Sequence, residues 1–177
     1  MIIEKEIASR IPRDYLFITG MVDIDSTYFK KKIEEGVQAS TINYKTNVVG
    51  KHTAWKFFNN DEQFSSLLLP LIDHLEDLTI PIESFYLDEA WGLIERFGGY
   101  TKKHTHGGAY LSGVLYIHDH PQKLYFPTIK QEVTPTKGRF VVFSSFLMHY
   151  THRNPKHKKK YAISFNFNYV NVGGLNI

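Results

Sequence analysis

Residues 161–170, YAISFNFNYV, alternate between two kinds of side chain, and this pattern decides the fold class. One set is apolar and the other is small or polar: Tyr161, Ile163, Phe165, Phe167 and Tyr169 against Ala162, Ser164, Asn166 and Asn168. Successive side chains of a β-strand point to opposite faces, so the run predicts a strand with one apolar face and one polar face.

Similar β-rich runs fill the C-terminal half, separated by turns that contain Gly, Pro or His. They are SFYLDEAWGLIER (84–96), AYLSGVLYIH (109–118), KLYFPTI (123–129) and GRFVVFSS (138–145). Residues 41–55 also predict strand and turn around Gly50. Many strands that follow a helical segment favour an α+β fold, mainly β, in which a sandwich or barrel carries helices on its outside.

The N-terminal part is expected to be helical. Asp25 or Ser26 can cap a first helix, for which Gly36 is the predicted stop. A second helix is expected to begin near Asp61, because apolar residues from Phe64 onward follow helical spacing. Pro70 interrupts that spacing, so we expect a kink or two abutting helices.

Composition excludes several classes of protein. The 177 residues favour one domain, and the absence of Cys excludes disulfides, zinc knuckles, iron–sulfur clusters and thiol catalysis. No apolar run approaches a membrane span, and the N-terminus lacks a secretory pattern, so we expect a cytoplasmic protein. A net charge of +3 does not indicate a nucleic-acid partner. The basic excess lies in residues 151–160, which predict a solvated turn or a contact for an acidic partner.

Three histidines have the spacing of metal ligands. His104 and His106 stand two residues apart, which places both rings on one face of an extended chain, and His149 follows a predicted strand. Neutral imidazoles suit Fe, Zn, Cu or Ni. The alternative is that His104 and His106 are polar loop residues. The HDH sequence at 118–120 precedes a proline and predicts a turn, and His52 is expected at the surface.

Lys160 begins a predicted strand shortly after His149, so its ammonium could enter the same pocket. A metal can chelate an α-keto acid through one carboxylate and the keto oxygen, and the far carboxylate then needs a cation. The hydroxyls of Tyr116 and Ser164 could add donors to that carboxylate.

These residues resemble a known pattern. From Trp91 to Asn168 the chain resembles the Fe(II)- and 2-oxoglutarate-dependent dioxygenases of the prolyl-hydroxylase-like type, and more narrowly a 2OG-Fe(II) oxygenase family of marine bacteria and their phages. The matching stretches are AWGLIERFGGYTKKHTHGGAYLSGVLYI, TPTKGRFVVFSSFLMHYTHRNP and KKYAISFNF, and residues 46–58 are similar to the N-terminal part of the narrower family.

The resemblance implies a double-stranded β-helix, or jelly roll, with supporting helices. It implies a single domain over residues 1–177, with helical and strand support in 1–80 and a jelly-roll core in 81–170. His104 matches the first iron ligand, His149 the distal ligand and Lys160 the residue that binds the C5 carboxylate of 2-oxoglutarate. Tyr116 matches a position that often offers a hydroxyl. The cofactors implied are Fe(II) and 2-oxoglutarate, in the cytoplasm of a marine bacterial or phage-infected cell.

Two positions depart from the wider superfamily. His106 stands where that superfamily has Asp or Glu, which leaves Fe²⁺ with a net charge of +2 if three neutral imidazoles bind it. A site of two histidines, in which His106 points away, is the alternative. Lys160 replaces the more common Arg and gives a point charge in place of a bidentate fork.

Two other functions remain open at this level. One is a cupin-like enzyme with three histidines and a metal but without 2-oxoglutarate, and the other is a non-catalytic jelly-roll binding module. The substrate, either a small molecule or a protein side chain, is not readable from the sequence. A homodimer through a sheet face is compatible with the aromatic-rich strands.

Overall fold

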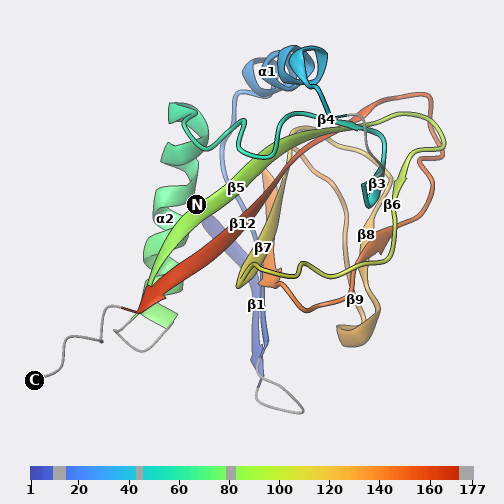
Figure 1. Ribbon diagram of the computed structural model, residues 1–177. Coiled ribbons are helices and arrows are strands. Elements are labelled where there is room, and N and C mark those ends of the chain that lie inside the picture. Colours follow the sequence, from blue (N-terminus) through green and yellow to red (C-terminus); the bar gives the residue numbers. More distant parts are fainter. Residues whose placement is uncertain (10–14, 43–45, 79–82, 172–177) are drawn as a thin grey trace, which may run out of the picture.

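The computed structural model describes residues 1–9, 15–42, 46–78 and 83–171, and its centre is a seven-stranded sheet (Figure 1). The strand order of this sheet is β1-β2-β10-β7-β12-β5-β4, and all its pairs are antiparallel. The bounds are β1 Ile2–Ser9, β2 Tyr15–Met21, β4 Lys51–His52, β5 Glu83–Glu95, β7 Leu111–Tyr116, β10 Arg139–Ser144 and β12 Lys160–Asn171.

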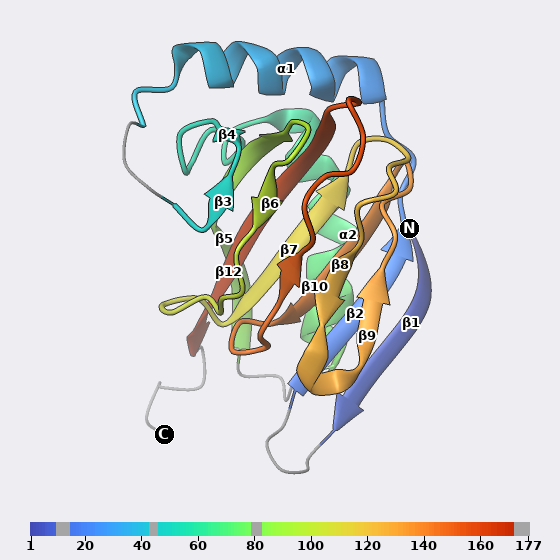
Figure 2. The ribbon, with the colours of Figure 1, turned by 90° about the vertical axis from the view of Figure 1, so that its right-hand side faces the viewer.

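Two smaller sheets and the helices cover opposite faces of the main sheet. The three-stranded sheet β11-β8-β9 (Tyr150–Thr151, Leu124–Phe126, Gln131–Val133) and the pair β3-β6 (Val48–Val49, Tyr100–Thr101) lie in front of it in Figure 2. Helices α1 (Ser26–Ala39) and α2 (Glu62–Leu78) contact β5 from the other side. A 3₁₀ turn, Pro127–Ile129, follows β8. The layers confirm the predicted mainly-β α+β fold.

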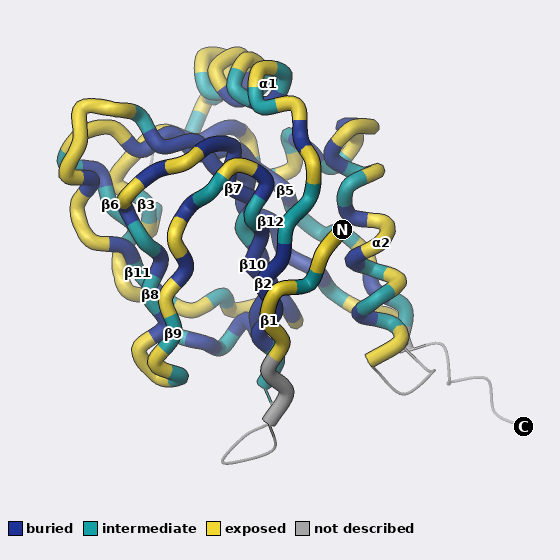
Figure 3. Tube along the Cα trace, turned by 180° about the vertical axis from the view of Figure 1, so that it is seen from behind, coloured by how far each residue is buried: buried dark blue, intermediate teal, exposed yellow. Residues whose placement is uncertain are grey.

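Burial divides the core into two parts. Side chains from the helices and from one face of the main sheet form the larger cluster, which includes Phe29, Ile33, Phe64, Ile163 and Phe165. A smaller cluster between the main sheet and β8-β9 includes Phe17, Phe126 and Phe143. The central strands are therefore buried on both faces (Figure 3). The polar face of β12 is buried too, because it faces the smaller sheets and not solvent.

The N-terminal segment differs from the expectation. Residues 2–9 and 15–21 form the strands β1 and β2, which were not among the predicted strands, whereas the first helix begins at Ser26, where the capping prediction placed it. β2 pairs with β10 through Phe17, Ile18, Thr19, Gly20 and Met21, which extends the main sheet. This pairing joins residues far apart in the sequence, which local helical propensity does not reveal.

The first helix runs past its predicted stop. The Asp25 carboxylate accepts hydrogen bonds from the backbone N–H groups of Thr27 and Tyr28, as the capping prediction requires. The helix continues to Ala39, because Gly36 serves packing and not termination. A Cβ at Gly36 would lie 2.6 Å from the Phe57 ring. The glycine therefore lets the helix approach the segment before α2.

The second helix is continuous through Pro70. Asp61 precedes it and accepts a hydrogen bond of 3.0 Å from the Phe64 N–H. Of the two outcomes expected at Pro70, two abutting helices did not occur, because α2 runs through the proline with Phe64, Leu68, Leu71 and Leu75 buried, and the kink stays a prediction. No helix of the described residues is long and apolar enough to cross a membrane. Of the segment predicted at 41–55, residues 43–45 lie outside the described ranges, and the rest forms β3 and β4 around Gly50.

Candidate metal centre and its pocket

A short backbone bridge brings His104 and His149 face to face. The N–H of His104 donates to the His149 carbonyl at 3.1 Å, and the N–H of His149 donates to the His104 carbonyl at 3.0 Å. The N–H of His106 donates to the Ser145 carbonyl at 2.9 Å. The three residues are therefore held by the loops before β7 and after β10, at one end of the main sheet.

The three imidazoles converge on a common point. Their candidate ligand nitrogens all lie within 4.8 Å of one another, and Nε2 of His106 is 3.3 Å from Nε2 of His149. The Nδ1 atoms of His104 and His149 lie 2.7 and 2.9 Å from the carbonyls of Lys102 and Leu147. Because a carbonyl only accepts, each Nδ1 carries the proton and leaves Nε2 as the electron-pair donor.

Burial keeps the three rings neutral. It lowers the pKa of His149 to about 3 and that of His106 to about 4, and it lowers the pKa of His104 as well. Metal ligands must bind as neutral imidazole, so the rings need not lose a proton near neutral pH. The donor set fits a first-row transition metal such as Fe(II), Zn or Ni.

All six residues predicted for the site line one pocket. These residues are His104, His106, Tyr116, His149, Lys160 and Ser164. The pocket is narrow, about 50 Å³, and its remaining walls include Trp91, Leu124 and Phe143. Among the described residues, the Tyr116 and Ser164 hydroxyls have no hydrogen-bond partner. Burial raises the pKa of the Tyr116 phenol, which therefore stays a hydrogen-bond donor.

Lys160 has a partner that the sequence did not predict. Its ammonium forms an ion pair with Glu95, which lies directly opposite on β5, and the two side chains are 5% and 0% exposed. The Thr101 hydroxyl donates to Oε1 of Glu95 at 3.1 Å. A buried carboxylate next to a buried ammonium satisfies both charges, which neither could tolerate alone.

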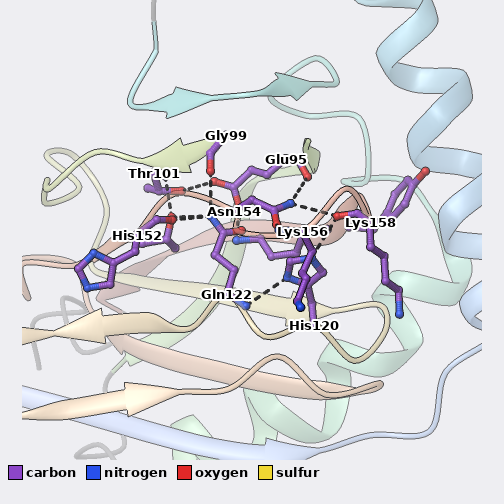
Figure 4. A network of polar contacts seen from close by, with 12 residues as sticks. Glu95, Gly99, Thr101, His120, Gln122, His152, Asn154, Lys156 and Lys158 are labelled. Carbon is purple, nitrogen blue, oxygen red and sulfur yellow. Dashed lines mark hydrogen bonds and ion pairs between the residues drawn. The ribbon is translucent and has the colours of Figure 1, made fainter. Parts of the chain in front are cut away.

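A network of amide hydrogen bonds surrounds this ion pair (Figure 4). The Asn154 side chain donates to the carbonyls of Glu95 and Lys158, both at 3.1 Å. The Gln122 side chain donates to the Gly99 carbonyl at 3.0 Å and to the His152 carbonyl at 2.7 Å. These bonds join the basic loop to the end of β5 and to the turn before β6, so the backbone behind Lys160 is held by several hydrogen bonds.

A second, wider groove adjoins the pocket on the side of His106. It has a volume of about 350 Å³ and shares Val48, Trp91, His104 and His106 with the inner pocket. His52, Trp55, Glu89 and Asn166 are among the other residues that line it. His52 is buried and its ring lies 4.7 Å from that of Trp55, so the expectation of a surface position for His52 was wrong.

Sequence reasoning missed Glu89 and the two tryptophans as residues that line the groove, and Glu95 as the buried partner of Lys160. Glu89, Trp91, Leu93 and Glu95 alternate along β5, opposite Asn166, Ser164, Ala162 and Lys160 of β12. The period of two within residues 84–96 was a signal that could have placed both carboxylates on one face. Their partners could not be read, because the cross-strand register depends on pairing between distant segments.

The remaining histidines and the basic loop have structural or exposed positions. His118 and His120 are buried in the predicted turn, where Nε2 of His118 accepts from the Tyr161 N–H at 3.4 Å. Arg153, Lys156 and Lys158 are exposed, as a solvated turn predicts, and Lys159 pairs with Glu34 at 2.9 Å.

Comparison with known proteins finds relatives by structure but not by sequence. No protein-family model matches the chain, and no curated protein matches it. A viral collagen prolyl hydroxylase of Paramecium bursaria Chlorella virus-1, solved with 2-oxoglutarate, is similar with a TM-score of 0.67 and 16% identity, over 86% of this chain and 94% of that one.

Two further solved structures are bacterial. A prolyl-4-hydroxylase of Pseudomonas putida is similar with a TM-score of 0.62 and 16% identity, over 86% of this chain and 91% of that one. HygX of Streptomyces hygroscopicus, solved with nickel and 2-oxoglutarate, has a TM-score of 0.59 and 12% identity, over 86% and 82%. The chain therefore has the jelly-roll fold of the 2-oxoglutarate-dependent prolyl hydroxylases.

Proposed function

We propose that this protein is an Fe(II)- and 2-oxoglutarate-dependent oxygenase that hydroxylates a substrate and releases succinate and CO₂. The observation that carries the proposal is that three neutral imidazoles and one ammonium line a single pocket. Relatives of the same fold that were solved with 2-oxoglutarate, or with nickel and 2-oxoglutarate, support it.

His104, His106 and His149 would hold the iron through their Nε2 atoms. The bound iron, with 2-oxoglutarate and O₂, supplies the oxidising chemistry that inserts oxygen into a C–H bond. The carbonyls of Lys102 and Leu147 orient two of the three rings. Trp91 and Phe143 keep water away from the inner wall. A role for His106 as the third ligand, in preference to a site of two histidines, is supported by its 3.3 Å approach to His149.

Lys160 would bind the far carboxylate of 2-oxoglutarate, with Tyr116 and Ser164 as hydroxyl donors. Lys160 and Ser164 lie on the inner face of β12, and Ala162, the residue between them on that face, is paired with Tyr116 of β7. The three side chains thus reach one wall of the pocket. An ammonium and two hydroxyls form a suitable set of donors for a carboxylate.

Glu95 explains how a three-histidine site can remain electrically balanced. In a site of two histidines and one carboxylate, the ligand carboxylate offsets the basic residue at the far end of the pocket. Here His106 replaces that carboxylate, and Glu95 supplies the missing negative charge next to Lys160. Fe²⁺ and the dianionic 2-oxoglutarate then cancel each other, as do Lys160 and Glu95. We infer that the ammonium is shared between Glu95 and the bound co-substrate.

Anaerobic titration with Fe(II) tests the proposal directly. The metal-to-ligand charge-transfer band of the iron chelate should appear only when both Fe(II) and 2-oxoglutarate are present. A metal-binding protein that gives no band with 2-oxoglutarate would instead fit the cupin-like alternative. A protein that binds no metal would fit the binding module. This test is needed because Glu95 already neutralises the Lys160 ammonium. The presence of Lys160 in the pocket does not by itself require an anionic ligand such as 2-oxoglutarate.

Other expectations stay predictions. They are one domain over residues 1–177, a cytoplasmic location and a homodimer through a sheet face. An acidic partner for the loop 151–160 also stays a prediction.

A further inference from the structure

We propose that the groove beside the metal centre recognises a positively charged group of the substrate, an ammonium or guanidinium, through Glu89. This inference rests on the proposed function, because it treats the groove as the place where the substrate to be hydroxylated binds. The groove shares His104 and His106 with the inner pocket, so a molecule in it lies next to the metal ligands.

The first observation is the charge of the groove. Glu89 is the one residue with a formal charge among the residues that line it, and its side chain is partly exposed. Within the described ranges, no Lys or Arg forms an ion pair with Glu89. The contact that holds it is a hydrogen bond of 3.1 Å from the Asn166 side-chain amide to Oε2. Oε1 therefore keeps its capacity to accept from a ligand.

The second observation is that Glu89 is held in place from behind. The Ser112 hydroxyl donates to Oδ1 of Asn166 at 2.8 Å, which fixes the amide with its N–H groups toward Glu89. Ser112 and Asn166 are both buried and pair across β7 and β12. A carboxylate oriented by a buried amide and hydroxyl is pre-organised, which reduces the entropy lost when a ligand binds.

The third observation is the aromatic wall next to the carboxylate. Trp91 lies two residues from Glu89 on the same face of β5, so the two side chains are roughly 7 Å apart along the strand. The Trp55 and Trp91 rings meet edge to face at 5.0 Å, and His52 lies against Trp55. Indole faces and a carboxylate together favour an organic cation, since the rings attract its charge and cover its carbon chain.

The neighbouring lysines do not reverse this preference. Lys102 donates to the Thr46 carbonyl at 3.2 Å, and with Lys51 it lines a neighbouring cavity that shares Thr46, Val48 and His52 with the groove. Lys103 is exposed and does not line the groove. The lining of the groove itself therefore offers an anionic ligand the charge of Glu89 and no lysine or arginine.

Intrinsic fluorescence gives a readout that needs no activity. The chain has two tryptophans, Trp55 and Trp91, and both line the groove, so quenching reports its occupancy. We would titrate the metal-free protein with three small probes of similar size: N-acetyl-lysinamide, which is cationic, N-acetyl-norleucinamide, which is neutral, and an anionic N-acetyl-glutamate amide. N-acetyl-argininamide tests the guanidinium, and a lysine-containing pentapeptide tests whether the cation belongs to a polypeptide.

The wild type should bind the cationic probes more tightly than the neutral one. Glu89→Gln should weaken cation binding roughly tenfold and leave neutral binding unchanged, because the amide still accepts from Asn166 but carries no charge. Asp88→Asn is the matched control. It removes a carboxylate from the next position of β5, where Asp88 contacts Lys56 and Asn168 outside the groove, and it should change neither affinity.

Equal binding of the cationic and neutral probes by the wild type would overturn the inference, as would tighter binding of the anionic probe. So would an effect of Asp88→Asn as large as that of Glu89→Gln. The charge-transfer titration separates the two proposals. If the charge-transfer band appears but the groove shows no preference for cationic probes, only the role of Glu89 is contradicted. If the groove prefers cationic probes but no band appears, the oxygenase proposal is contradicted and the groove remains a cation-binding site. Tighter binding of the pentapeptide than of N-acetyl-lysinamide assigns the cation to a protein side chain, and the reverse assigns it to a small molecule.

Discussion

The inner face of β5 carries two carboxylates, Glu95 beside Lys160 at the inner end of the site and Glu89 in the groove at its outer end, and they have different surroundings. Glu95 is fully buried, and its charge is matched by the Lys160 ammonium. Glu89 is partly exposed and has only the Asn166 amide. Burial makes an unpaired charge too costly at the first position, whereas contact with water permits it at the second. The inner end is therefore constrained by stability, and the outer end is available for recognition.

The largest effect should come from the proposed metal ligands, which lie between these two ends. His149→Ala should reduce Fe(II) affinity by roughly 100-fold or more. The substitution removes one of the three proposed ligands, the imidazole that faces His104 across the backbone bridge. Equilibrium dialysis with Fe(II) under anaerobic conditions measures this loss. The exposed His152→Ala is the control, and equal loss in both variants would remove His149 from the metal site.

The next largest effect tests the buried end. Lys160→Met should lower the free energy of unfolding by about 3–5 kcal/mol, because it leaves the Glu95 carboxylate buried without a cation. Urea denaturation measures the change. The adjacent Lys159→Met removes a largely exposed pair with Glu34 and should cost at most about 1 kcal/mol. Similar losses for the two variants would mean that the burial of the Lys160–Glu95 pair has no special cost.

A smaller loss of stability is expected when the same ion pair is changed from the other side. Glu95→Gln should cost about 1–3 kcal/mol, since the amide still accepts a hydrogen bond but leaves the ammonium without an opposite charge. The free ammonium should then favour a dicarboxylate. We expect the rise in Tm on adding 2-oxoglutarate with Ni(II) to be larger than in the wild type. A smaller rise would show that Glu95 helps to bind the co-substrate and does not compete with it.

The smallest change in stability should occur at the outer end. Glu89→Gln should alter the free energy of unfolding by no more than about 0.5 kcal/mol, because the side chain is partly exposed and its contact with Asn166 survives. Urea denaturation of Glu89→Gln beside Glu95→Gln compares the two ends with the same chemical change. Equal losses in the free energy of unfolding would contradict the distinction between the buried Glu95 and the partly exposed Glu89.

The central strands and the histidine group could both be predicted from the sequence, because both depend on local patterns. Period-two alternation in β12 and the two-residue spacing of His104 and His106 are both local properties of extended chain. β1 and β2 were missed because they owe their structure to pairing within the sheet, β2 with β10 and β1 with β2. Glu95 was missed as the partner of Lys160 because cross-strand register is a property of the assembled sheet.

Gly36 and Pro70 show why local signals can mislead. Each residue type commonly ends a helix, yet each lies inside one here. Gly36 is required by the close approach of Phe57, which is a tertiary contact. Pro70 is tolerated because the buried stripe of α2 continues on both sides of it.

The backbone bridge between His104 and His149 would give an ion bound by these two rings a second, structural role. It ties a loop that precedes β7 to one that follows β10, two segments distant in sequence that are also joined by the backbone hydrogen bonds from His106 to Ser145 and from Ser145 to Tyr110. An ion held by both rings would link the two loops. It would stabilise their paired arrangement, and the stabilisation would grow as the concentration of free ion rises above its dissociation constant. Slower hydrogen exchange at the His104 and His149 amides should therefore report loading of the centre, even in a variant that turns over no substrate.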